Sequence, residues 1–417
     1  MALENILKII DPVKASAIEK ALDGRDLTEK DIVELLRSGG LELTALTMAA
    51  DLLRKRIVGD IVTYVVNRNI NFTNICVMGC GFCAFSKDFR SEEVYFLPIS
   101  EIVRRAEEAW RYGATEVCIQ AGLPPRIDPY HYVHIVEAIK RKIPQIHIHA
   151  FSPVEVVYGA NLAGVSVEEY LKTLKEAGLD SLPGTAAEIL DDEIRAKISP
   201  GRISVETWVN VITTAHKLGI PTTSTIMYGH VENEHHIAKH LLLLQRIQRE
   251  TNGFTEFIPL SFIHREAPMW KYNLVPGLRP GPTWREVIAL HAAARLLFRE
   301  EIPNIQASWV KEGAKMAQQL LEAGCNDLGG TLMNESISTT AGATSGQLMR
   351  PRELRNIIRS IRRIPAQRTT LYKIIKTYYN EEDETELDKI ENPEEQFGSY
   401  WQLVKDPRFK RYVRQKN

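Results

Sequence analysis

Cysteine, long apolar runs and excess charge are all scarce in this sequence. Only five of its 417 residues are cysteine, an odd number that does not suit the paired disulfide framework of a small secreted domain. No stretch approaches the roughly 20 uninterrupted apolar residues of a membrane span. The N-terminal MALENILKII carries Glu4 and Lys8 inside its apolar run, so we expect it to be a helix and not a secretory signal. A formal net charge of −1 offers no basic surface to nucleic acid or anionic lipid. We therefore expect a soluble, cytoplasmic protein with no nucleic-acid or membrane partner.

What the chain has is a regular alternation of strand-like and helical segments. Residues 1–59 contain only helical patterns, and β-branched runs begin at residue 60. The strand candidates are residues 61–66, 116–120, 146–151, 180–184, 222–229, 255–262, 304–309 and 327–332. Eight strand–helix units in about 280 residues predict an α/β fold of the (β/α)8 barrel type. A doubly wound sheet is the alternative, and the absence of a GxGxxG after the first strand disfavours it.

This pattern divides the chain into three parts. Residues 1–59 form an N-terminal helical extension, residues 60–350 the barrel, and residues 351–417 C-terminal helices with a charged tail. We expect residues 351–379 to be helices packed on the barrel. We expect residues 380–417, which include the acidic run NEEDETELDKIENPEEQ, to be a loosely attached tail, since such runs are usually solvated.

Three of the five cysteines lie within eight residues, in CVMGCGFC, directly after the first strand candidate. Cys76, Cys80 and Cys83 have the spacing Cys-x3-Cys-x2-Cys. A structural zinc site usually has four ligands in two pairs. A four-iron cube held by three thiolates keeps one iron free for a substrate or cofactor. Gly79 and Gly81 suit a loop that wraps tightly around a cluster. Active sites of (β/α)8 barrels lie at this end of the strands.

This spacing in this place resembles the radical S-adenosylmethionine (SAM) superfamily. The resemblance implies a [4Fe-4S] cluster on Cys76, Cys80 and Cys83. It also implies that the open iron chelates SAM, whose one-electron cleavage gives methionine and a 5′-deoxyadenosyl radical. Phe82 matches the aromatic residue that members commonly carry before the last cysteine, close to the adenine.

Further positions match the SAM pocket of that superfamily. Ala121 and Gly122 follow the second strand candidate, where members have a Gly-Gly-Glu segment whose backbone binds the SAM amino group. The glutamate is absent here, and Gln120 precedes the pair. Glu188, in PGTAAEIL, matches a carboxylate that binds the ribose hydroxyls, although a glutamate at a helix start needs no ligand to be favourable. Tyr228, in STIMYGHVE, matches a segment beside the adenine.

Longer phrases narrow the resemblance to one family. NRNINFTNIC, HIHAFSPVEV, RPGPT, IPNIQASWVK and NDLGGTLMNESIS, in this order, resemble the second subunit of FO synthase. Members of that family are tyrosine 4-hydroxyphenyl transferases of deazaflavin FO and coenzyme F420 biosynthesis. The resemblance covers about residues 40–375. Val77 departs from it, because the family often has tyrosine at that position.

The resemblance implies a reaction between L-tyrosine and 5-amino-6-(D-ribitylamino)uracil. The Cα–Cβ bond of tyrosine breaks, 2-iminoacetate leaves, and the 4-hydroxybenzyl group joins C5 of the uracil. The implied partners are the first subunit of FO synthase, which closes the deazaflavin ring, and an electron donor such as ferredoxin or flavodoxin.

Polar residues near the expected strand ends are candidates for substrate contacts. His149 and His264 are the candidate catalytic residues, because the pKa of histidine lies near neutrality. A histidine on a packed barrel wall is as often a satisfied core residue. Candidates for substrate binding are Ser152, Glu155, Asn304, Ser308, Asp327 and Thr331. The last two are equally compatible with turns.

Three other functions remain as alternatives. A menaquinone-pathway radical SAM enzyme, either aminofutalosine synthase or dehypoxanthine futalosine cyclase, shares the cluster and the barrel. An electron-transfer or scaffold protein would hold a cluster without SAM chemistry, but four thiolates are usual there. A structural zinc protein would give no air-sensitive brown colour.

Overall fold

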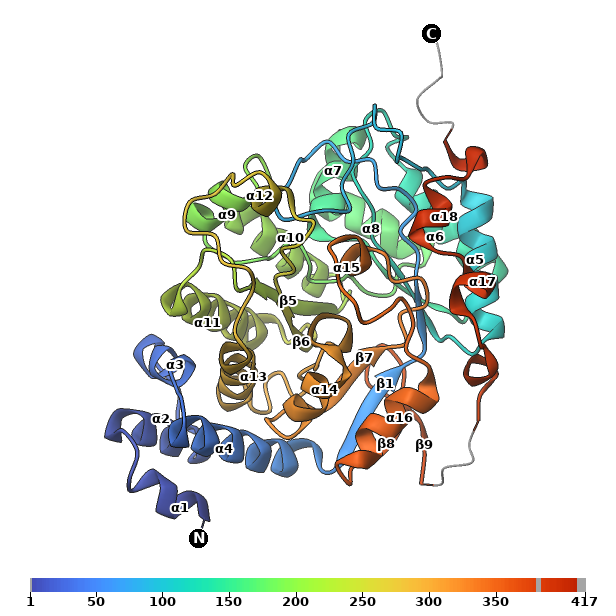
Figure 1. Cartoon of the computed structure of the whole chain (residues 1–417). Coiled ribbons are helices and arrows are strands. Elements are labelled where there is room, and N and C mark those ends of the chain that lie inside the picture. Colours follow the sequence, from blue (N-terminus) through green and yellow to red (C-terminus); the bar gives the residue numbers. More distant parts are fainter. Residues whose placement is uncertain (1, 380–383, 411–417) are drawn as a thin grey trace.

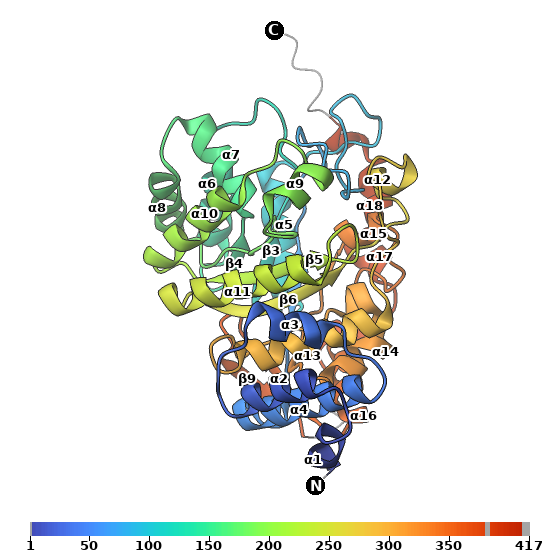
Figure 2. The ribbon, with the colours of Figure 1, turned by 90° about the vertical axis from the view of Figure 1, so that its left-hand side faces the viewer.

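Four helices begin the described chain, which covers residues 2–379 and 384–410 of this computed structural model. They are α1 (Ala2–Leu7), α2 (Pro12–Leu22), α3 (Glu29–Leu36) and α4 (Leu41–Val58). The side chains of Asp11 and Thr28 accept backbone N–H bonds at the starts of α2 and α3, satisfying donors that the helices leave free. α4 packs on α13 (Trp284–Phe298), as Figure 2 shows. The helices expected in this region are confirmed.

The strands form three hydrogen-bonded sheets, with the orders β7-β1-β8-β9, β2-β3-β4 and β5-β6. They are β1 (Ile61–Val65), β2 (Asn67–Asn69), β3 (Glu116–Ile119), β4 (His147–Ala150), β5 (Thr222–Tyr228), β6 (Phe254–Ser261), β7 (Asp327–Gly330), β8 (Ile364–Arg368) and β9 (Ile374–Thr377). All pairings among them are parallel except that of β8 with β9. Six of the eight expected strands are confirmed as strands.

Single β-bridges link the sheets where regular strands do not form. Residues 180–184 and 304–309, both expected as strands, contribute only such bridges. The bridges are His149 to Ser181, Leu182 to Thr222, Phe257 to Ile305, Gln306 to Asp327 and Arg68 to Met333. The predicted α/β class is confirmed.

Helices alternate with these strands and cover them (Figure 1). The long ones are α5 (Ile99–Arg111), α6 (His131–Lys142), α7 (Pro153–Ala163), α8 (Val167–Ala177), α10 (Val205–Lys217), α11 (Glu234–Thr251), α13, α14 (Trp309–Leu321) and α16 (Pro351–Ser360). Three short helices lie toward the opposite end from α1 in Figure 2, namely α9 (Asp192–Ile198), α12 (Pro268–Lys271) and α15 (Ile337–Thr340). Within residues 2–379 and 384–410, no helix has the length and apolar character needed to cross a membrane.

The C-terminal region differs from the expectation of helices alone. Among its described residues, α16 is the one long helix, and β8 and β9 follow it. β8 pairs in parallel with β1, from Ile61 opposite Ile364 to Tyr64 opposite Gln367. The segment IPAQR has little strand character of its own, because proline and alanine are poor strand residues. Its pairing with β1 therefore decides its conformation.

Residues 384–410 are packed on the protein, so the expectation of a loosely attached tail is wrong for this segment. Its short elements are η1 (Glu386–Lys389), α17 (Pro393–Phe397), α18 (Tyr400–Leu403) and η2 (Pro407–Phe409). Their side chains Leu387, Phe397, Tyr400 and Phe409 are buried. Asn334 Nδ2 donates to the carbonyl of Phe397 at 3.0 Å. The rest of the expected tail, residues 380–383 and 411–417, lies outside the described residues.

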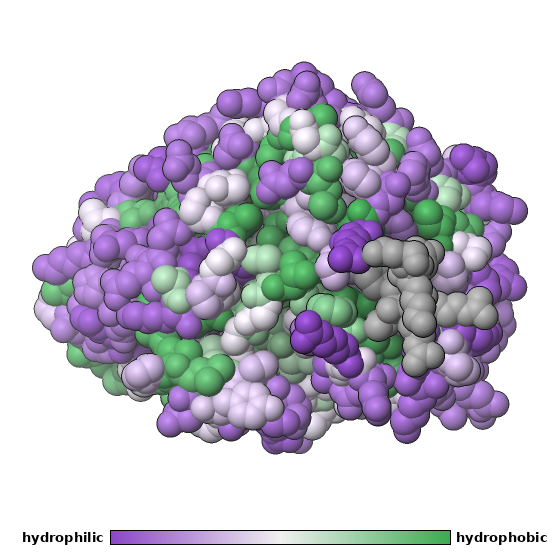
Figure 3. Space-filling model, turned by 90° about the horizontal axis from the view of Figure 1, so that it is seen from above, coloured by the Kyte–Doolittle hydropathy of each residue, from purple (hydrophilic) through white to green (hydrophobic). Residues whose placement is uncertain are grey.

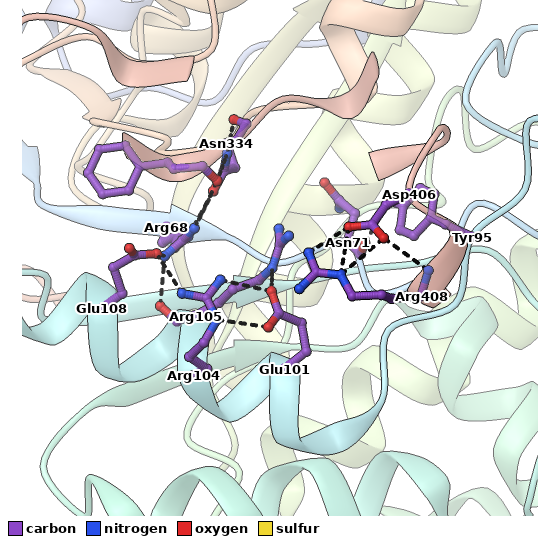
Figure 4. Close-up of polar contacts among 12 residues, drawn as sticks. Arg68, Asn71, Tyr95, Glu101, Arg104, Arg105, Glu108, Asn334, Asp406 and Arg408 are labelled. Carbon is purple, nitrogen blue, oxygen red and sulfur yellow. Dashed lines mark hydrogen bonds and ion pairs between the residues drawn. The ribbon is translucent and has the colours of Figure 1, made fainter. Parts of the chain in front are cut away.

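A buried arginine lies at the point where the C-terminal segment meets β2. Arg68 is fully buried, and its Nη1 donates to Glu108 of α5 at 2.6 Å. Its Nε donates to Asn334 Oδ1 at 2.9 Å, and its guanidinium lies over the Phe397 ring at 5.3 Å. Figure 4 shows Arg68 between Glu108 and Asn334. Losing Glu108 would leave the Arg68 charge buried without a counter-charge. Asn334 binds both Arg68 and the carbonyl of Phe397, so it ties the C-terminal segment to β2.

Candidate active site

A cavity of about 230 Å³ opens beyond the carboxyl ends of the strands. Residues that directly follow β3, β4 and the Ser181 bridge line it, together with side chains of β5 and β6. Figure 3 views this end of the molecule, where apolar side chains gather in the middle and hydrophilic ones surround them. The position agrees with the rule that strand carboxyl ends carry the active sites of parallel α/β folds.

The cysteine loop forms one wall of this cavity. Cys76, Cys80 and Cys83 all line it, and all five cysteines of the chain are free thiols. Two segments distant in sequence hold the loop from behind. Gly81 N donates to the carbonyl of Ile198 at 2.9 Å, and Met269 N donates to the carbonyl of Gly81 at 2.7 Å. Backbone contacts with residues at the ends of α9 and α12 thus help to fix the loop.

The chemistry of these thiols fits a cluster. Burial raises the pKa of Cys80 to about 12 and also raises the pKa of Cys83. Such thiols become thiolates when a metal cation supplies the compensating charge. Among the described residues, no three His, Cys, Asp or Glu side chains could share a single metal ion. A cube makes a different demand, because each thiolate binds its own iron.

The backbone beside the cysteine loop leaves no room for a side chain at Gly122. A Cβ there would lie 2.2 Å from the carbonyl oxygen of Ile75 and 3.1 Å from Cys76 Cβ. Gly122 N donates to the carbonyl of Thr73 at 2.9 Å. The segment after β3 therefore touches the cysteine loop directly, and Gln120, Ala121 and Gly122 all line the cavity. Their binding of SAM stays a prediction.

A buried ion pair faces the cysteines from the other side. Arg202 Nη1 donates to Glu188 Oε1 at 2.6 Å, and the guanidinium lies over the Phe82 ring at 5.4 Å. All three residues line the cavity. Burial disfavours the charge on Arg202, but the charges of Glu188 and Cys80 outweigh burial and hold its pKa above the ordinary value.

Two polar atoms of this pair have no hydrogen-bond partner. They are Glu188 Oε2 and Arg202 Nε, although Oε2 is 3.6 Å from Arg195. Glu188 also has a φ of 42°, a costly left-handed backbone for a residue with a Cβ. Unsatisfied buried polar atoms beside a cavity are what a polar cofactor would pair with. The residues present therefore fit SAM as well as a cluster.

Glu155 and Ser152 line the cavity below the segment after β3. Glu155 Oε1 accepts from Ala121 N at 3.0 Å, and its Oε2 accepts from Ser152 N at 2.8 Å and Ser152 Oγ at 2.5 Å. Burial raises the pKa of Glu155 to about 7, although these hydrogen bonds oppose the shift. Glu155 thus caps α7 together with Ser152 and also positions Ala121. These hydrogen bonds give both residues, which were expected to bind substrate, a structural role.

The two histidines proposed as catalytic do not line the cavity. His149 is buried in β4 with Nδ1 2.7 Å from Ser181 Oγ, and burial lowers its pKa to about 3, so it is neutral. His264 is half-buried, with its ring 4.6 Å from the Trp270 ring, centroid to centroid. Neither arrangement supplies a proton to the cavity.

Five other predicted site residues also lie elsewhere. Tyr228 lines a second cavity, and its hydroxyl is 3.4 Å from Ser261 Oγ. The remaining four are Asn304, Ser308, Asp327 and Thr331, none of which lines the first cavity. Ser308 is buried before α14. Asn304 and Asp327 stand at or before the amino-terminal ends of their strands, facing the opposite end of the fold.

Hydrogen bonds within the protein account for three of these side chains. Asn304 Nδ2 donates to the carbonyl of Thr255 at 2.9 Å. Asp327 accepts from Arg368 Nε at 2.6 Å, and both are buried. Thr331 Oγ1 donates to the carbonyl of Asn67 at 2.9 Å. These residues hold strands together.

Sequence reasoning missed Arg202, Thr185 and Lys311, which all line the cavity. Thr185 Oγ1 donates to Gln120 Oε1 at 2.8 Å. Arg202 lies 14 residues from its partner Glu188 and on the far side of α9, so no local spacing indicated the pair. Lys311 could have been found from the sequence, because it lies two residues after the strand candidate 304–309, at the end of the predicted barrel where active sites lie.

Known proteins agree with this site. A model of the radical SAM superfamily matches residues 70–244, which include the cysteine loop, and a CofH/MqnC C-terminal region model matches residues 251–380. The FeFe-hydrogenase maturase HydG from Carboxydothermus hydrogenoformans has the same fold. It superposes with a TM-score of 0.66 at 13% identity, over 89% of this chain and 85% of that one. The cysteine loop, the cavity and the fold thus define a radical SAM enzyme.

Curated relatives define the family more narrowly. The 5-amino-6-(D-ribitylamino)uracil–L-tyrosine 4-hydroxyphenyl transferase of Methanocaldococcus jannaschii is 51% identical over 355 residues, which cover 84% of this chain and 98% of that protein. FO synthase of Streptomyces avermitilis is 48% identical over 88% of this chain, but over only 42% of its own length. The chain belongs to the family of the 5-amino-6-(D-ribitylamino)uracil–L-tyrosine 4-hydroxyphenyl transferases. The menaquinone alternative shares the C-terminal model, and the curated relatives favour the transferase over it.

Proposed function

We propose that this chain transfers the 4-hydroxybenzyl group of L-tyrosine to 5-amino-6-(D-ribitylamino)uracil in the biosynthesis of deazaflavin FO. The products are the uracil adduct, 2-iminoacetate, methionine and 5′-deoxyadenosine. The observation that carries the proposal is the 51% identity, over nearly its whole length, to a protein that bears this activity as its name. The three thiols that line one cavity supply the chemical means.

We infer that Cys76, Cys80 and Cys83 hold a [4Fe-4S] cluster, and that Phe82, Gln120, Ala121, Gly122 and Glu188 contact SAM. Together the cluster and SAM supply a 5′-deoxyadenosyl radical by one-electron cleavage. The carboxylate of Glu188 has one oxygen paired with Arg202 and the other without a hydrogen bond, which suits a ribose hydroxyl donor. Tyr228, His149, His264 and the four strand residues have no support from the cavity.

The protein's own contribution is to hold the reactants away from water. The apolar part of the cavity includes Met227, Leu260, Phe262 and Ile263, none of which is a reactive proton source. A wall of this kind suits a radical reaction, since it limits side reactions with solvent. The fixed loops after β3 and β4 would keep SAM and substrate in one orientation.

The proposal also includes the closure of the barrel, a partner protein, and the cellular compartment with its electron donor. The single bridges between the sheets support a closed (β/α)8 ring made by residues 60–350, with residues 2–59, 351–379 and 384–410 outside it. The longer FO synthase, of which this chain matches 42%, supports a partner that carries the other half of the reaction. Five free thiols favour a reducing cytoplasm, where ferredoxin or flavodoxin would supply the electron.

An anaerobic reaction tests the proposal. The purified chain is loaded with iron and sulfide and mixed with SAM, reductant, L-tyrosine and 5-amino-6-(D-ribitylamino)uracil. Mass spectrometry should find the 4-hydroxybenzyl adduct of the uracil together with 5′-deoxyadenosine, and only when both substrates are present. 5′-Deoxyadenosine without adduct would refute the specific transfer. A Cys80→Ala variant serves as the control without activity.

A further inference from the structure

Among the described residues, a single lysine lines the cavity. Lys311 lies in the first turn of α14 and lines the cavity together with Ile337 and Ala341. Gly313, with φ 77° and ψ 161°, interrupts the helix immediately afterwards. The turn that carries Lys311 is therefore separate from the rest of α14.

Two residues that flank Lys311 in this turn, Trp309 and Glu312, are anchored. Trp309 is buried, and its Nε1 donates to the carbonyl of Gly330 at 2.9 Å. Glu312 Oε1 accepts from Ser261 Oγ at 2.5 Å, and Ser261 also lines the cavity. The backbone of Lys311 is thus held on both sides, which fixes where its side chain enters.

The other charged side chains of the cavity already have partners. Arg202 is paired with Glu188 at 2.6 Å, and Glu155 accepts three hydrogen bonds from Ala121 and Ser152. Among the described residues, Lys311 forms no hydrogen bond or ion pair through its side chain. Burial lowers its pKa, while the charges of Glu335 and Glu312 act in the opposite direction.

A cation in an apolar cavity is costly unless a ligand supplies the opposite charge. We propose that Lys311 binds the α-carboxylate of the amino acid substrate, an inference that rests on the proposed function. L-Tyrosine carries this carboxylate, whereas the ribityl chain and the uracil ring offer only neutral polar groups. The 2-iminoacetate fragment keeps the carboxylate after Cα–Cβ cleavage. Lys311 therefore retains that fragment while the 4-hydroxybenzyl group moves to the uracil.

Two variants and two ligands test this contact. Lys311→Met keeps the length of the side chain and removes the charge, and Lys311→Arg keeps the charge. Lys315→Met, at an exposed position of the same helix, is the matched control. Equilibrium binding of L-tyrosine and of tyramine, which lacks the carboxylate, is measured on the enzyme loaded with cluster and SAM.

We expect Lys311→Met to weaken L-tyrosine binding about 10- to 100-fold, the range for a charge-assisted hydrogen bond. Tyramine binding, SAM binding and iron content should not change. Lys311→Arg should restore most of the tyrosine affinity, and Lys315→Met should behave as wild type. Wild-type enzyme should prefer L-tyrosine over tyramine, and Lys311→Met should lose that preference.

Three results would overturn the assignment. Equal weakening of tyrosine and tyramine would mean that Lys311 only shapes the cavity. Weaker SAM binding would mean that it serves the carboxylate of SAM. Equal affinity of the wild type for the two ligands would exclude carboxylate recognition even if Lys311→Met fails to fold. A wild type that binds tyrosine through Lys311 and forms no uracil adduct would refute the proposed function alone.

Discussion

Asp327→Asn distinguishes a substrate-binding carboxylate from a structural one. Asp327 accepts from Arg368 Nε at 2.6 Å and Nη2 at 3.0 Å, and from Gly329 N at 2.6 Å. Asp327 is fully buried and Arg368 is 2% exposed. Asparagine keeps the shape and leaves the guanidinium without its main counter-charge. Breaking a buried pair from one side costs about 3–5 kcal/mol.

Glu256 moderates this cost, so we expect the lower end of the range. Its Oε2 lies 3.8 Å from Arg368, but burial raises its pKa to about 7, so it carries only part of a charge at neutral pH. A loss of about 3 kcal/mol corresponds to a fall in melting temperature of roughly 3–6 °C, because the shift per kcal/mol decreases with chain length.

The assay compares thermal unfolding of the purified protein with the KM for 5-amino-6-(D-ribitylamino)uracil. Asp327→Asn should melt earlier and keep its KM within about twofold, since a carboxylate at the amino end of β7 is far from the cavity. Asp327→Leu combined with Arg368→Met removes both charges and should recover much of the stability. An unchanged melting temperature with a KM raised tenfold would refute this reasoning and restore Asp327 as a substrate ligand.

Three further predictions address the cavity walls. Gly122→Ala should reduce the iron content after reconstitution, because the added Cβ would meet the cysteine loop. The control Gly113→Ala, whose Cβ would have nothing within 4 Å, should cost only about 1–2 kcal/mol of backbone strain and take up iron normally. Iron and sulfide analysis of the reconstituted proteins measures the difference. Tyr400→Leu should speed the loss of iron to a chelator, because Tyr400 packs on Phe85 beside the cysteines with ring centroids 5.9 Å apart. Tyr400→Phe should lose only the 3.1 Å hydrogen bond from Asn74, about 1 kcal/mol of stability. Equal rates of iron loss from Tyr400→Leu and wild type would contradict this role. Glu155 has a folded pKa of about 7 against an ordinary 4.5, so the folded state binds the extra proton and stability should fall as pH rises between these values, by about 3 kcal/mol in total. Glu155→Gln should abolish that slope in unfolding measurements across the interval, and an unchanged slope would assign it to other groups.

Local patterns predicted most of the helices and strands and brought out the three candidate cluster ligands. Residues 222–229 were expected as a strand from their β-branched run, and β5 is Thr222–Tyr228. The Cys-x3-Cys-x2-Cys spacing is contained in eight residues, so a single loop carries every thiol that the cluster needs. Contacts of this kind depend only on neighbours in the chain, which is why sequence reveals them.

Contacts between distant segments were decided only by the tertiary structure. The strand β8 exists because β1 pairs with it, and a charged segment that resembles a solvated tail is packed because Arg68 and Asn334 receive it. Distant segments also meet in the candidate site. Arg202, which follows α9 in the chain, and Lys311 of α14 both line the cavity. Asp327 and Thr331 stand in a strand-end phrase of the sequence. The strand direction puts Asp327 at the amino end of β7, where Arg368 binds it, and Thr331 binds the carbonyl of Asn67. Direction, burial and long-range pairing depend on how all the elements pack together, so no spacing along one segment encodes them.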